Sequence, residues 1–149
     1  MLPLWVAKDR RIFEKYGVNA ELIYIAEKEI LNSGIGMKKD FYNENPKLAE
    51  ILVTSLIEAN AFIMSNKEET IKIISKWTGI DDPKVAEKTY DVNVETIPQK
   101  PYVTDTSAQF FLDNSDNQEV RKMKPSDIVD MSIVKKLDES GFINGLYKK

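Results

Sequence analysis

The 149-residue chain falls within the size range of one domain, and at that length a single core can bury most of the apolar surface. Its composition, 42% hydrophobic and 30% charged, is typical of a globular protein rather than a disordered or fibrous one. The 21 basic and 24 acidic residues give a formal net charge of -3. We therefore expect no nucleic-acid partner, because the chain lacks the positive field that would hold a phosphate backbone.

The chain contains no cysteine and no histidine. The absence of cysteine excludes disulfides and thiolate nucleophiles, and the absence of histidine removes the commonest general base and metal ligand. A serine nucleophile would also lack its usual partner. We therefore expect a protein that is not an enzyme, with no catalytic residues, no metal and no cofactor.

The first elements in chain order suggest helix followed by strand. A helix is expected over residues 3–16, where a proline opens it, apolar residues follow at helical spacing and Gly17 supplies the stop. The β-branched and aromatic residues of 20–25 predict a strand. A second short strand is expected over 33–37, and the segment 26–31 between them is ambiguous.

The signals after residue 38 are helical. An Asn-Pro pair opens a long apolar helix over 46–65, and a capping-box spacing over 66–69 opens another over 66–77. We expect these two helices to pack together as the core, with Trp77 largely buried. Further helices are expected over 82–90, 106–112 and 132–139. Residues 115–124 show only a weak helical pattern, and an extended segment is expected over 93–104.

This tally of about two short strands and five to six helices predicts a helix-rich α/β fold. Two short strands do not make a stable sheet unless helices or further strands cover them. The whole chain, residues 1–149, is expected to form a single shortened domain.

Few patterns point to chemistry. The glycines of 34–36 lack the third glycine of a phosphate cradle, so packing is the better interpretation. The acidic pairs at 68–69 and 81–82 lie where helix starts favour negative charge, so we interpret them as caps. Most aromatic residues recur at helical spacing and belong to a core. Trp5 differs because it lies at a helix start, where carboxylate, sulfonate or phosphate groups commonly bind.

Two blocks of this sequence resemble one family. The first, residues 1–25, reads MLPLWVAKDRRIFEKYGVNAELIYI and resembles a first helix and the following strand of the solute-binding proteins of ABC transporters. The group in question handles nitrate, taurine, aliphatic sulfonates and thiamine pyrimidine precursors. The second, residues 32–149, is similar to their C-terminal part and includes the phrase KPSDIVDMSIVKKLDESGFINGLY. The two blocks meet at a junction over 26–31.

The resemblance implies a fold and a role. The fold would be a truncated lobe of the type II periplasmic-binding-protein class, lacking the first strand and the middle of the chain. The role would be ABC import of small organic anions or thiamine-precursor-like pyrimidines, with a small-molecule solute and an ABC permease as partners. In the family the solute lies in a cleft between two lobes, and the matching positions here are Leu4, Trp5, Asn32 and Ser33.

The resemblance also implies an extracytoplasmic or periplasmic location. The first residues lack the basic region and apolar stretch of a signal peptide, so the chain expressed as written is expected in the cytoplasm.

A second interpretation stays open. Half a cleft does not enclose a solute, and ligand sites usually bury most of the ligand surface. The chain would then be a non-binding remnant helical domain that forms a homo-oligomer or pairs with a partner through exposed apolar surface. Stabilisation by solutes would favour the first interpretation, and concentration-dependent oligomers the second.

Overall fold

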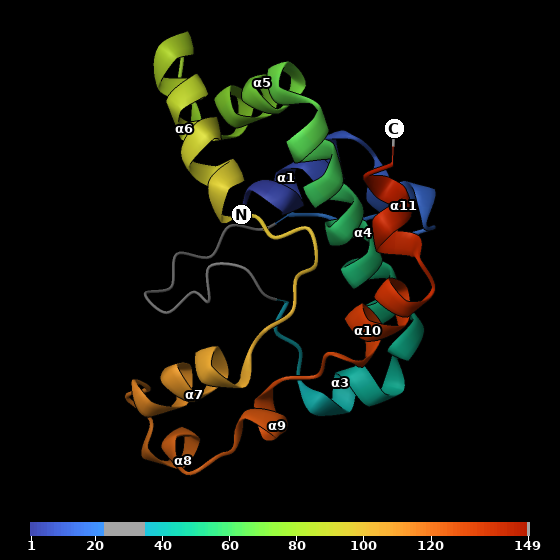
Figure 1. Cartoon of the computed structure of the whole chain (residues 1–149), viewed down its shortest axis with the longest axis vertical. Helices are drawn as coiled ribbons and strands as arrows, with labels where there is room; N and C mark the ends of the chain where they lie inside the picture. Colours follow the sequence, from blue (N-terminus) through green and yellow to red (C-terminus); the bar gives the residue numbers. More distant parts are fainter. Residues whose placement is uncertain (23–34, 149) are drawn as a thin grey trace.

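The computed structural model describes residues 1–22 and 35–148, and every regular element in these ranges is a helix (Figure 1). In chain order the described helices are α1 (Leu2–Asp9), α2 (Ile12–Lys15), α3 (Lys39–Glu44), α4 (Pro46–Ser65), α5 (Lys67–Thr78), α6 (Pro83–Thr96), α7 (Asp105–Asp113), α8 (Gln118–Arg121), α9 (Pro125–Ile128), α10 (Ser132–Glu139) and α11 (Phe142–Leu146).

The expected α/β class, with its two-stranded truncated lobe, is wrong: the fold is helical. Residues 20–22 of the first expected strand and 35–37 of the second are irregular, and the remaining residues of both lie outside the described ranges. β-propensity reflects fit to a pleated, half-buried surface more than an intrinsic backbone preference. The described chain offers no strand against which such a surface would form.

Helix α4 is the centre of the molecule (Figure 1). One of its faces packs with α1, α2, α5 and α6 in a first apolar cluster, to which α4 contributes the fully buried Ala59 and Ile63. Its other face packs against α10 and α11 in a second cluster, through Ile57. A helix buried on two sides needs apolar residues around much of its circumference, which explains the apolar sequence of this element.

The length and composition of α4 would also allow it to cross a membrane. The helix has 20 residues and its most apolar window has a mean hydropathy of 1.5. Core helices of globular proteins meet the same test, and 44% of that window is buried inside the fold. The test is therefore weak evidence for a membrane span.

The expected helix over 3–16 is broken into α1 and α2. The break is at Arg11, whose φ of 56° is left-handed, a conformation that costs a non-glycine residue about 1–2 kcal/mol. The turn lets both short helices face α4, so Val6 and Phe13 enter the same cluster. Gly17 has a φ of 81° and follows the end of α2, as expected.

The core is not a simple pair of long helices. Helices α4 and α5 have nearly the expected bounds, but α1 packs across both of them and supplies much of the first cluster. Trp77 is partly buried, with more of its surface covered than exposed, which agrees with the expectation that it is largely buried. It packs at the edge of the cluster rather than inside it.

Candidate functional site

The structure describes two of the four residues that the family resemblance assigns to a ligand site. Leu4 and Trp5 lie on α1, are half-buried and pack against the first cluster. The Trp5 ring stacks on the Trp77 ring with centroids 6.1 Å apart and planes 6° from parallel. Asn32 and Ser33 lie outside the described residues. Packing against the first cluster thus explains the half-burial of Leu4 and Trp5.

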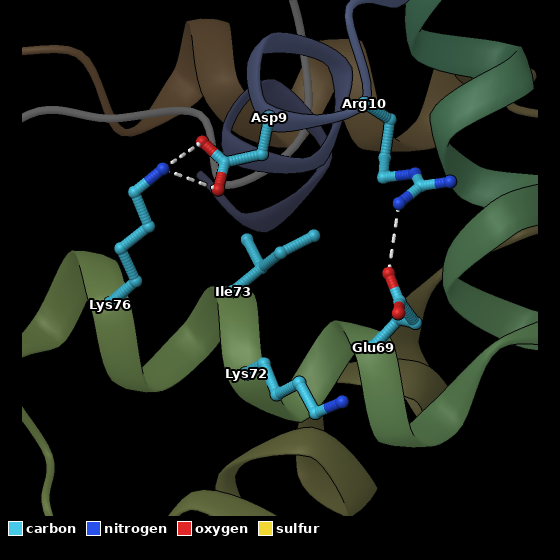
Figure 2. A pocket seen from close by; sticks show the side chains of 6 residues that line it. All are labelled: Asp9, Arg10, Glu69, Lys72, Ile73 and Lys76. Atoms are coloured by element: carbon cyan, nitrogen blue, oxygen red, sulfur yellow. Dashed lines mark hydrogen bonds and ion pairs between the residues drawn. The ribbon is translucent and has the colours of Figure 1, made fainter.

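Beside this aromatic pair, a polar seam joins α1 to α5 (Figure 2). We call it the α1–α5 seam and define it by Asp9, Arg10, Glu69, Lys76 and Trp77. The Lys76 Nζ donates to both Asp9 oxygens at 2.7 and 2.9 Å, and the Trp77 Nε1 donates to Asp9 Oδ1 at 3.1 Å. The Asp9 carboxylate therefore accepts hydrogen bonds from both an ammonium group and an indole in the last turn of α5.

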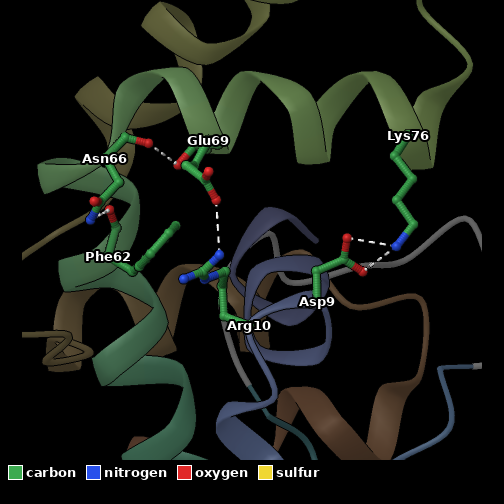
Figure 3. Close-up of polar contacts among 7 residues, drawn as sticks. Asp9, Arg10, Phe62, Asn66, Glu69 and Lys76 are labelled. Carbon is green, nitrogen blue, oxygen red and sulfur yellow. Dashed lines mark hydrogen bonds and ion pairs between the residues drawn. The ribbon is translucent and has the colours of Figure 1, made fainter.

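The second half of the seam centres on the Arg10 guanidinium (Figure 3). Its Nη1 donates to Glu69 Oε2 at 2.8 Å, and its Cζ lies 4.8 Å from the centroid of the Phe62 ring. Arg10 thereby contacts α4 and α5 at once, which suits a planar cation that can pair and stack together.

A shallow hollow of about 210 Å³ opens along the seam, lined by Asp9, Arg10, Glu69, Lys72, Ile73 and Lys76. Most of the charge in it is already paired across the two helices. Exposed pairs of this kind contribute about 0–1 kcal/mol to stability each. The seam therefore orients α1 on α5, and it lacks the enclosed apolar surroundings of a typical small-molecule site.

We expect Asp9→Ala to lower the free energy of unfolding by about 1–3 kcal/mol, because it leaves the half-buried Trp77 Nε1 without its acceptor. The matched variant Lys76→Met keeps the Asp9 acceptor and removes the ion pair together with the contact of Lys76 Nζ with the Trp77 ring, 6.0 Å from its centroid; because this lysine is 63% exposed, the change should cost at most about 1 kcal/mol. Urea unfolding followed by tryptophan fluorescence measures both. Equal costs for the two variants would contradict this assignment.

A second hollow of about 290 Å³ lies between α2, α4 and α11, and Glu58 is one of its lining residues. Glu58 accepts hydrogen bonds from Lys15 Nζ at 2.6 and 2.8 Å and from the Tyr16 hydroxyl at 2.8 Å. Burial, together with the hydrogen bond to Glu58 and its negative charge, raises the pKa of the Tyr16 phenol well above its ordinary value. The phenol is therefore a hydrogen-bond donor that stays protonated, not a base.

This raised pKa predicts a pH dependence of stability. The folded protein holds the Tyr16 proton more tightly than the unfolded chain, so the stabilisation is complete below the unfolded pKa of about 10 and is lost as pH rises above it. Urea unfolding at increasing alkaline pH should show wild type losing stability relative to Tyr16→Phe, at most about 1.4 kcal/mol per pH unit for one proton. A constant difference between the two proteins above that pH would contradict the prediction.

No local sequence pattern indicates the α1–α5 seam. Asp9 lies 67 and 68 residues from its partners Lys76 and Trp77, so no local spacing links them. Among the described residues, no three acidic side chains lie close enough together to bind a metal ion.

Comparison of the chain with protein-family models, with curated proteins and with solved structures finds no match. The family resemblance therefore depends on the two sequence blocks themselves.

Proposed function

We propose that this chain acts as a solute-binding component of an ABC import system for small organic anions or thiamine-precursor-like pyrimidines. In this role it would work outside the cytoplasm and deliver solute to an ABC permease. The proposal comes from the resemblance of residues 1–25 and 32–149 to one group of solute-binding proteins.

One structural observation supports treating the two blocks as a unit. Helix α1 comes from the first block, and α4 and α5 come from the second, yet all three share the first apolar cluster. Val6 and Ala7 of α1 are fully buried in it. The blocks therefore fold as parts of one core rather than as unrelated segments.

Isothermal titration calorimetry and thermal unfolding with nitrate, taurine, an alkanesulfonate and an aminopyrimidine test the proposal. A genuine solute at a hundredfold excess over its Kd should stabilise the fold by about 2.7 kcal/mol, which raises Tm by roughly 5–10 °C. Asn32→Ala should weaken that binding at least about tenfold, a loss of about 1.4 kcal/mol. Its matched control is Asn43→Ala, at an exposed position of α3. Absence of heat and of any Tm shift across the panel would contradict the proposal.

A second candidate function is association through exposed apolar surface, as a homo-oligomer or with a protein partner. The observation that favours it is the exposure of large apolar side chains on two helices: Val85 (49%) and Val92 (59%) on α6, and Phe110 (69%) on α7. Such groups on a protein surface can mark interaction sites. Sedimentation velocity over a wide concentration range, compared with Phe110→Ala, distinguishes the candidates. Concentration-dependent oligomers without solute binding would favour association.

A further inference from the structure

Helices α7, α8 and α9 form a unit that packs separately from the rest of the described chain (Figure 1). Helix α7 contacts both α8 and α9, and it buries Ala108 and Leu112. Neither of the two apolar clusters includes a residue of this unit. Within the described ranges, the hydrogen bonds of residues 104–128 also stay inside that segment, apart from the Val129 backbone N–H, which donates to the Pro125 carbonyl at 3.0 Å at the end of α9.

Two connectors attach the unit to the core. The first covers residues 97–104 and contains Pro98 and Pro101, whose fixed φ angles stiffen it. The second covers residues 129–131 and leads into α10. Among the described residues the unit shares no apolar cluster with the core, so the contacts of the connectors orient it.

Two side chains of the first connector meet at one carboxylate of α10. Lys100 Nζ lies 2.8 Å from Asp138 Oδ1, and the Tyr102 hydroxyl donates to Asp138 Oδ2 at 3.0 Å. The Asp138 side chain is only 17% exposed, and the hydrogen bond from Lys100, followed by that from Tyr102, lowers its pKa. Next to it, the Val103 backbone N–H donates to Met131 Sδ at 3.3 Å, which joins the two connectors to each other.

A carboxylate also lies in the second connector. Asp130 accepts the Ser132 backbone N–H at 2.8 Å, and its hydrogen bonds with Ser132 lower its pKa. This contact fixes the point where the chain leaves the unit. The connectors are thus tied to the core through the Asp138 carboxylate and through the packing of Ile97 against the first cluster and of Met131 against the second.

We propose that α7–α9 moves as one body about residues 97–104 and 129–131, and that Asp138 is the latch that holds it in the orientation seen. Releasing Lys100 and Tyr102 from Asp138 frees the first connector and leaves the helical core intact. This inference does not depend on the proposed function, because it uses only the packing of the unit and the contacts of its connectors.

A distance measurement between the unit and the core tests the latch. The chain has no cysteine, so Lys47→Cys on α4 and Gln118→Cys on α8 give a protein that spin labels modify at two sites only. Pulsed electron–electron double resonance between the two spin labels should give one narrow distance distribution for this protein. Adding Asp138→Ala should broaden and shift it. The matched control Asp113→Ala, an exposed carboxylate bonded only within α7, should leave it unchanged.

A second variant controls for the case in which Asp138→Ala disturbs folding. Lys100→Met combined with Tyr102→Phe breaks the same contact from exposed side chains and leaves Asp138 in place. It should broaden the distribution as Asp138→Ala does, with an unchanged helical circular dichroism spectrum. A distribution that stays narrow in both variants, or that is already equally broad without them, would overturn the proposal.

Discussion

Phe13→Ala should lower the free energy of unfolding by about 3–5 kcal/mol, a large part of the roughly 5–15 kcal/mol that stabilises a typical domain. Phe13 is 1% exposed and is among the largest fully buried side chains of the described core. It lies on α2, just after the turn at Arg11, and it faces α4 within the first cluster. Its removal leaves a cavity where α1, α2 and α4 meet.

Phe110→Ala is the matched control for this prediction. Phe110 has the same side chain but is 69% exposed on α7, so its removal should change the free energy of unfolding by less than about 0.5 kcal/mol. Urea unfolding followed by far-UV circular dichroism measures both variants. Similar costs for Phe13→Ala and Phe110→Ala would mean that the first cluster does not form as described.

Ile143→Ala should cost about 2–5 kcal/mol and should destabilise the whole core rather than only the C-terminal end. Ile143 is 1% exposed on α11 and packs with Ile57 of α4 in the second cluster. Helix α4 takes part in both clusters, so loss of packing on one face weakens the support of the other.

The measurement for Ile143→Ala compares two probes. Tryptophan fluorescence reports the first cluster, where Trp5 and Trp77 pack, and far-UV circular dichroism reports all helices. Both transitions should shift together to lower urea concentration. Ile35→Ala, at a position that is 37% exposed, serves as the control and should shift neither. A circular dichroism change without a fluorescence change would contradict the shared role of α4.

The helices that were predicted correctly from the sequence begin or end at residues that are typical of helix termini. Pro46 opens α4, Asp82 caps α6 by accepting the Lys84 backbone N–H at 2.9 Å, and Gly79 ends α5 with a φ of 71°. The capping box expected over 66–69 is absent, however, because Asn66 directs its Nδ2 to the Phe62 carbonyl. Helix α6 also continues to Thr96, so the first part of the segment expected to be extended is helical.

The sequence-based predictions are wrong where tertiary contacts determine the backbone conformation or bring distant residues together. The strand expected over 20–25 rested on β-propensity, which needs neighbouring strands to take effect, and the strand expected over 33–37 rested on its glycines. The break at Arg11 places a non-glycine residue in a left-handed conformation, which no sequence rule signals. The stacking of Trp5 on Trp77 and the bond from Trp77 to Asp9 join residues that are far apart in the chain. Residue spacing identified Trp5 as unusual but gave no indication of its partner.

Amide hydrogen exchange in α1 tests the central claim, that this short helix next to the N-terminus is part of the core with α4 and α5. Isolated helices of eight residues do not persist in water, so protection in α1 must come from tertiary packing. We predict that the backbone amides of Val6 and Ala7 exchange only with global unfolding, with the same opening free energy as the centre of α4. Exchange of these amides at the rate of a frayed end, while α4 stays protected, would contradict it.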